Sequence, residues 1–268
     1  MRLGSEQALQ RLLHTWEGVV ANRPDAAIGW AQEIFAAGTV LESETALTRA
    51  ATNPASPGQS RTELMNSVFG GKVSGEVLDL LGGLARDSFK DSEDLVEAVS
   101  RAGVETLFMS AQYANRLHDV EEELYRASRV LSEQRELRRT LDDKSIDAGR
   151  RQGLARQVFG SWSPETVALL EHGVESDQQI IHQLRRWIGD AGRRSEHLVA
   201  IVTAAQPLEA DQEERLTALL AKRYGKPVEI HVGVDPALIG GVRIAIGPDV
   251  IDGTLASRIK HVKSVFAD

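Results

Sequence analysis

Apolar residues recur three and four positions apart along the first two thirds of the chain, the spacing that gathers them on one face of an α-helix. Ile34, Leu41 and Leu47 follow this pattern. Turn residues at positions 53–58 interrupt it, and the Ser163-Pro164 pair is typical of a helix start, where serine caps free amides and proline loses no needed donor. The pattern therefore predicts short helices separated by turns.

The pattern changes character at Leu198. A continuous apolar run there is typical of a strand, helical spacing then returns, and alternation of apolar and polar residues follows. A small α+β module is therefore expected after a mostly helical region. Its predicted elements are strand 198–203, helix 210–224, strand 228–232, strand 238–247 interrupted by Gly240-Gly241, strand 250–251, and a closing helix that ends near Phe266.

The chain also aligns with itself at an offset of 90 residues, without a gap. Val68-Phe69-Gly70 falls on Val158-Phe159-Gly160, and Arg61 falls on Arg151. Such matches are mostly apolar residues or glycine, as a shared core requires, and they favour duplication over chance similarity between leucine-rich and arginine-rich helices. Further matched pairs are Leu47 and Leu137, Val77 and Val167, Leu80 and Leu170, and Gly83 and Gly173.

The offset also places the start of the second copy inside the segment that closes the first. Leu9 falls on Val99, and Arg11 falls on Arg101. We therefore expect one long helix, about residues 91–115, to join two helical bundles. The predicted domains are a first bundle at 1–94, a second bundle at 95–197 and the α+β module at 198–268.

Composition narrows the possible chemistry. The 268 residues are 42% hydrophobic, enough for a sizeable core, and the absence of cysteine excludes disulfides, thiolate nucleophiles and cysteine-ligated metals. The net charge of −8, with no evident basic stripe, argues against nucleic acid. No apolar run approaches the roughly 20 residues of a membrane helix, and the first residues lack a signal-peptide core, so a soluble cytoplasmic protein without membrane insertion is expected.

Candidate catalytic groups have simpler explanations. Asp235 and Asp252 each adjoin turn residues, where aspartate binds backbone amides, and no base or nucleophile accompanies them. The pair Gly240-Gly241 lacks the lysine and hydroxyl residue of a phosphate-binding loop. The seven histidines show no close metal-ligand spacing. We expect no catalytic residue, cofactor or metal.

Two segments of the module carry a family resemblance. The sequence Val234-Asp235-Pro236-Ala237-Leu238-Ile239-Gly240-Gly241, followed by Val250-Ile251-Asp252-Gly253-Thr254-Leu255-Ala256-Ser257-Arg258, resembles the C-terminal signature of the ATP synthase delta subunit, whose mitochondrial counterpart is the oligomycin-sensitivity-conferring protein (OSCP). The extra bundle resembles the enlarged delta proteins of actinobacteria. The signature residues expected to have structural roles are Asp235, Pro236, Gly240, Gly241, Ile251, Asp252 and Gly253.

This resemblance implies a non-catalytic stator in the peripheral stalk of the rotary proton-translocating ATP synthase, at the cytoplasmic face of the bacterial plasma membrane. Helices one and five of the bundle would bind the N-terminal helix of an alpha subunit. The groove candidates are Leu9, Leu13, Trp16, Val77, Leu80 and Leu84 in copy one, and Val99, Gly103, Thr106, Val167, Leu170 and Val174 in copy two. Bulkier apolar residues make copy one the expected alpha-binding bundle, with copy two a spacer or the site of a second helix.

The resemblance also implies that the module binds the end of a b-type stalk subunit. On the closing helix, Ile259, Val262, Val265 and Phe266 recur three and four apart, and they either contact the stalk or cover the sheet. Two other functions remain open: a general helical-repeat adaptor unrelated to ATP synthase, and a hydrolase or nucleotide-binding enzyme, for which no site constellation is evident.

Overall fold

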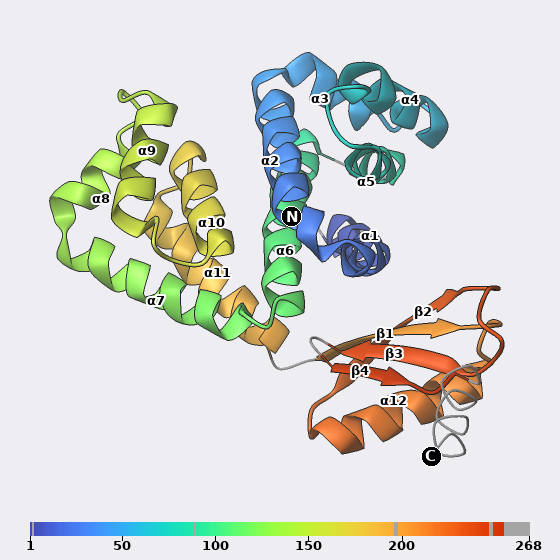
Figure 1. The fold of residues 1–268 in the computed structure, drawn as a ribbon. Helices are drawn as coiled ribbons and strands as arrows, with labels where there is room; N and C mark the ends of the chain where they lie inside the picture. The colour runs from blue at the N-terminus through green and yellow to red at the C-terminus, as the bar shows by residue number, and fades with distance from the viewer. Residues whose placement is uncertain (2, 88, 90, 196–197, 247–248, 255–268) are drawn as a thin grey trace.

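The structure is a computed structural model, and it describes residues 1–254 except 2, 88, 90, 196–197 and 247–248 (Figure 1). A mostly helical chain with a small C-terminal α+β module is confirmed. The first helices are α1 (Leu3–Asn22), η1 (Pro24–Ala26), α2 (Ala27–Ser43), α3 (Thr45–Ala51), α4 (Gly58–Phe69), α5 (Gly75–Arg86) and α6 (Ser92–Tyr113). The next are α7 (Leu117–Glu133), α8 (Arg135–Asp142), α9 (Ala148–Phe159), α10 (Pro164–Glu175) and α11 (Ile180–Ser195).

The 90-residue repeat is visible in the helices: α7 begins and ends 90 residues after α2, and α9 begins and ends 90 residues after α4. A buried arginine at the same position of each copy binds carbonyl groups at the end of the fifth helix. Arg61 Nε donates to the Ala85 carbonyl of α5 at 2.7 Å, and Arg151 donates to the Val174 carbonyl of α10. The last carbonyls of a helix lack intrahelical partners. Each arginine can therefore be buried, because these carbonyls accept hydrogen bonds from its guanidinium.

A glutamate at the same position of each copy binds the start of the fifth helix. Glu33 accepts hydrogen bonds from the Ser74 amide and hydroxyl at 2.8 and 2.7 Å, and Glu123 accepts from the Ser163 amide at 3.0 Å. A carboxylate is favoured at a helix N-terminus. The expected cap by the Ser163 hydroxyl is wrong, because this side chain accepts no capping hydrogen bond and Glu123 accepts one from the Ser163 amide instead, whereas Pro164 does occupy the first turn of α10.

Two hydrophobic cores fill the helical region, and α2 and α6 contribute to both of them. Ile34 of α2 and Leu95 of α6 lie in the first core, and Phe35 and Phe108 lie in the second. The two helices pack together along most of their length, between the two bundles (Figure 1). The bundles are therefore joined by shared helices.

A third core lies in the module, which contains β1 (Leu198–Ala204), α12 (Ala210–Tyr224), β2 (Val228–Val234), β3 (Val242–Ile246) and β4 (Asp249–Asp252). The sheet order is β2-β1-β3-β4; β1 and β2 are parallel, and the other pairs are antiparallel. The helix α12 covers one face (Figure 1). The predicted strand through Gly240-Gly241 is wrong: both glycines precede β3, with φ of 106° and 83°, values that a strand does not allow.

Candidate partner-binding surfaces

The six groove candidates of copy one all lie inside the first core. Each is at most 6% exposed, so none forms an outer wall that a partner touches. Their helices α1 and α5 do pack together, and the buried residues support that packing from within. These candidates are Leu9, Leu13, Trp16, Val77, Leu80 and Leu84.

Other residues form the solvent side of the α1–α5 junction. Leu12, Thr15 and Val19 follow each other along α1 at helical spacing; Leu12 and Val19 are half-buried, and Thr15 is exposed. On α5, Gly83 faces Leu12 so closely that an added Cβ would lie 2.8 Å from Leu12 Cδ1. The surface is therefore a shallow apolar strip with no side chain on its α5 side at position 83.

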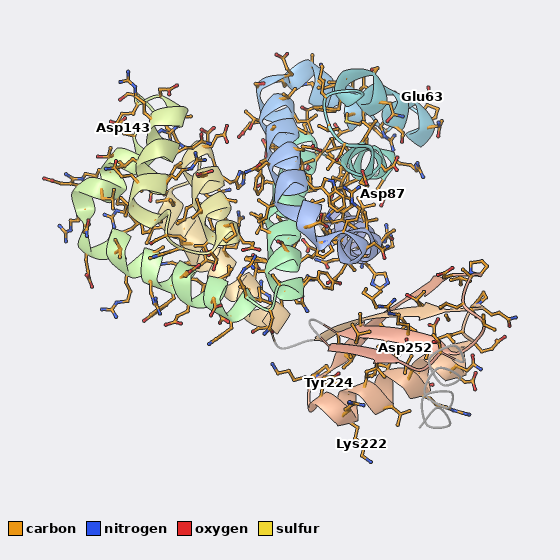
Figure 2. The ribbon with its side chains drawn as sticks, in the orientation of Figure 1. Glu63, Asp87, Asp143, Lys222, Tyr224 and Asp252 are labelled. Carbon is orange, nitrogen blue, oxygen red and sulfur yellow. The ribbon has the colours of Figure 1, made fainter. Side chains whose placement is uncertain are left out.

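Ion pairs flank this strip at both ends. Arg11 lies 3.6 Å from Asp87, just after α5, and Arg23 lies 3.0 Å from Glu76, in the first turn of α5 (Figure 2 labels Asp87). All four side chains are at least one-third exposed. Such pairs contribute about 0–1 kcal/mol to stability, and their main effect is to surround apolar surface with charge of both signs.

The copy-two candidates on α6 do not line a groove of the second bundle. Val99 lies in the first core, and Thr106 accepts a hydrogen bond from Trp16 of α1. The prediction is wrong because α6 is shared: its offset-matched face already packs into the first bundle. The face that enters the second core is formed by Val104, Leu107, Phe108 and Ala111, and on α10 Leu170 and Val174 are buried while Val167 is half-buried.

Helix α2 fills the angle between α6 and α10. Phe35 stacks on the His172 ring of α10, with centroids 3.8 Å apart and an interplanar angle of 8°. Gly103 of α6 leaves room for the same ring, because an added Cβ there would lie 2.3 Å from Phe35 Cε1. Ser100 Oγ lies 2.9 Å from His172 Nε2. Three helices thus meet at one aromatic contact.

Burial, reinforced by Arg186, lowers the pKa of His172 to about 4. The ring is therefore neutral at physiological pH, which suits its contact with Phe35. Sequence reasoning missed both residues, because a histidine without metal-ligand spacing and a core phenylalanine carry no distinctive signal.

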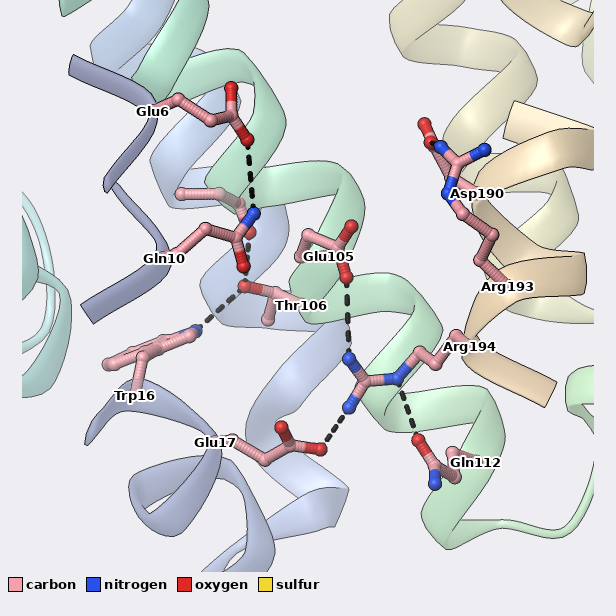
Figure 3. Close-up of polar contacts among 11 residues, drawn as sticks. Glu6, Gln10, Trp16, Glu17, Glu105, Thr106, Gln112, Asp190, Arg193 and Arg194 are labelled. Carbon is pink, nitrogen blue, oxygen red and sulfur yellow. Dashed lines mark hydrogen bonds and ion pairs between the residues drawn. The ribbon is translucent and has the colours of Figure 1, made fainter. Parts of the chain in front are cut away.

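Arg194, in the last turn of α11, ties the second bundle to the first (Figure 3). Its guanidinium pairs with Glu17 of α1 and with Glu105 of α6 at 3.3 Å, and its Nε donates to Gln112 Oε1 at 2.6 Å. Burial raises the pKa of Glu105, while Arg194 opposes that rise. The tie lies directly before the module and therefore fixes the end of α11.

The signature aspartates of the module stabilise turns. Asp235 accepts a hydrogen bond from the Ala237 amide at 2.9 Å. Asp252, labelled in Figure 2, accepts from the Thr254 amide at 3.0 Å and hydroxyl at 2.7 Å. These bonds lower the pKa of Asp252. Contacts of this kind occupy the carboxylates with backbone groups.

The signature glycines hold two chain segments together. An added Cβ at Gly241 would lie 2.5 Å from the Gly253 carbonyl oxygen, and the Gly253 amide donates to the Val242 carbonyl at 2.9 Å. Ile251 pairs with Ile244 across β3 and β4. Gly241 and Gly253 therefore allow the two backbone segments to approach closely.

A cleft of about 610 Å³ opens beside this signature. Ile239 at its edge is 72% exposed, unusual for a large apolar side chain. The predicted stalk contacts Ile259, Val262, Val265 and Phe266 lie outside the described residues. Apolar residues lining the cleft include Leu208, Pro236, Leu238 and Ile239.

The described part of the chain lacks two features. No three histidine, aspartate or glutamate side chains there gather as a metal site would require. No helix within the same residues is long and apolar enough to cross a membrane.

Comparison with known proteins gives a consistent family match. The family described as ATP synthase delta (OSCP) subunit matches residues 99–266. A protein of Beutenbergia cavernae named ATP synthase subunit delta is 34% identical over 270 residues, which covers 100% of both chains. Proteins of the same name from Streptomyces griseus and Nocardia farcinica are 33% and 34% identical, covering 97% and 100% of both chains. The similarity to these relatives includes the first bundle.

Proposed function

The chain belongs to the ATP synthase delta (OSCP) family, and from this premise we propose that it joins the N-terminal helix of an alpha subunit to a b-type stalk subunit. Delta subunits are components of the peripheral stalk of ATP synthase. A stator has to hold its partners at two separate places while the rotor turns. The shape of this chain, two joined bundles and a module, suits that role.

The outer α1–α5 strip carries the proposal for the alpha end. Leu12 and Val19 offer apolar contacts at helical spacing, Gly83 lets Leu12 pack closely against α5, and charged pairs flank them. An amphipathic helix that lies along such a strip buries its apolar face and leaves its polar face in water. The six buried candidates then act by holding α1 against α5.

The domains at 1–94, 95–197 and 198–268 are proposed as one load-bearing body. Shared packing of α2 and α6 and the Arg194 tie resist bending between the bundles. Such stiffness is what a stator requires, because a flexible joint between its ends would let the head follow the rotor.

For the stalk end, we propose the module. The predicted contacts Ile259, Val262, Val265 and Phe266 belong to it, and the cleft beside Pro236 and Ile239 adds exposed apolar surface. The protein would act without chemistry of its own, as a peripheral component on the cytoplasmic face of the plasma membrane.

Calorimetric titration of the full chain tests both ends. Synthetic peptides of the alpha N-terminal helix and the b C-terminal segment are each expected to bind. Leu12→Asp is expected to weaken alpha binding at least tenfold, since it places a charge in the apolar strip, and to leave b binding unchanged. Tyr125→Asp, on the exposed side of α7, is the control. Failure of both peptides to bind overturns the stator proposal and favours the unrelated adaptor.

A further inference from the structure

We propose that the second bundle has a helix-binding groove of the same kind, already filled by α2 of the same chain, so that the protein binds one alpha helix and binds it at the first bundle. This inference rests on the proposed function. It assigns α2 the position of an internal ligand and leaves the α1–α5 strip as the open site.

The fifth helices establish which positions correspond. Ser74 and Ser163 are the N-cap residues of α5 and α10, and Asp87 and Ser176 are their C-cap residues, so both ends recur 89 residues apart. The structure thus shifts the sequence alignment by one residue at this helix. Gly83 of α5 then corresponds to His172 of α10.

These corresponding positions have different surroundings. The atoms nearest to an added Cβ at Gly83 all belong to Leu12 of α1, the helix that precedes it in the same bundle. His172 instead lies under Phe35 of α2, which packs against α6 and also touches α10. Helix α2 therefore covers this place on α6 and α10, whereas on α1 and α5 it is covered only by the half-buried side chain of Leu12.

The two copies of the second helix, α2 and α7, differ on the face that contacts the second bundle in α2. Ile28, Ala31 and Phe35, on the face of α2 that contacts the second bundle, belong to or pack against the second core. One repeat later, α7 carries His118, Glu121 and Tyr125, and Tyr125 is 54% exposed. This helix face is apolar in α2, where the second bundle covers it, and more polar in α7, where it contacts water.

The spacing on α2 also describes the partner that the first groove fits. Three apolar anchors at positions i, i+3 and i+7 are the recurrent pattern of a helix lying in a groove. A partner of the first bundle is therefore an amphipathic helix with small or large apolar residues at this spacing.

Labelled single-cysteine variants distinguish the two grooves, because the chain has no cysteine of its own. Thr15→Cys places a fluorophore beside the first groove, and Thr39→Cys places one on α2 beside the second. Titration with the alpha N-terminal peptide is expected to give one peptide per chain and a response from the Thr15→Cys label alone. Two peptides per chain, or a response from the Thr39→Cys label, overturns the inference.

Hydrogen exchange tests the internal ligand separately, so that failure of the proposed function is recognisable. If no peptide binds, the stator proposal falls, and exchange alone decides whether α2 is held by the second bundle. Phe35→Ala is expected to speed amide exchange in α2 and α10 roughly a hundredfold, since it removes a buried aromatic ring. The matched change Tyr125→Ala is expected to leave both helices unaffected. Equal effects of the two variants contradict the proposal.

Discussion

Trp16 Nε1 donates a hydrogen bond to Thr106 Oγ1 at 2.8 Å, and these two residues occupy the same position in successive copies of the repeat (Figure 3). Thr106 in turn donates to the Ala102 carbonyl at 2.6 Å. Corresponding helices of the duplication therefore meet face to face. Because α6 uses this face for α1, it offers a different face to the second bundle.

Thr106→Val tests that bond. The substitution keeps the shape of the side chain and leaves the buried Trp16 N–H without its acceptor, at an expected cost of about 1–3 kcal/mol. Urea unfolding followed by tryptophan fluorescence measures the loss. Thr15→Val is the control, since Thr15 makes the same kind of hydroxyl contact to its own helix but is exposed. Equal losses in the two variants would contradict a special role for the Trp16 contact.

Gly103→Ala is expected to destabilise the junction of the bundles by roughly 1–3 kcal/mol, because the added methyl group overlaps the Phe35 ring. Gly29→Ala, in α2, has no atom within 4 Å of the added group and is expected to stabilise by about 0.5–1 kcal/mol through helix propensity. Thermal unfolding of both variants gives the comparison. The close packing described at Gly103 is wrong if both changes raise the melting temperature.

Arg194→Gln is expected to destabilise the protein by roughly 2 kcal/mol or more, since it removes a charge from a largely buried cluster. Burial already raises the pKa of Glu105, and loss of Arg194 raises that pKa further. The folded variant then holds the Glu105 proton more tightly than the unfolded chain does. Its stability therefore falls as pH rises through this range, so the deficit relative to wild type is largest at neutral pH.

Urea unfolding at pH 7 and pH 5 checks this dependence. The difference in unfolding free energy between Arg194→Gln and wild type is expected to shrink at the lower pH. A difference that grows as pH falls would show that Glu105 is not the group whose charge Arg194 balances. Arg129→Gln, in an exposed pair with Glu133, provides a control with little expected effect.

Gly241→Ala is expected to destabilise the module by roughly 1–3 kcal/mol, because the residue has φ of +83° and lies against the Gly253 carbonyl. The two bundles share no core with the module and should keep their amide protection. Gly233→Ala, in β2 with open space around it, is the matched control. Hydrogen exchange by segment measures the effect, and loss of protection in the bundles would contradict separate cores.

Local patterns predicted most of the fold. Strand-like runs at Leu198 and Val228 and the helix between them appear almost at the predicted bounds, because their spacing reflects burial on one face. The strand through Gly240 failed, since sequence spacing does not reveal a positive φ. Periodicity alone was therefore insufficient to predict an element whose bounds depend on backbone conformation.

The candidate groove was harder to predict. The repeat correctly identified the related helices. However, an alignment offset shows only which residues correspond, and it does not show which side of a helix faces a partner. Leu13 and Leu80 fit helical spacing because they are core residues, while Leu12 and Gly83, outside them, form the surface. In the second copy, Val99 was assigned to the wrong bundle because α6 serves both.

Native mass spectrometry of the full chain mixed with the alpha N-terminal and b C-terminal peptides tests the central claim most directly. The account predicts a single complex of one chain, one alpha peptide and one b peptide, because the two partners bind separate parts of a stiff body. Binding in which either peptide excludes the other, or no complex containing both, would contradict a stator that holds both partners at once.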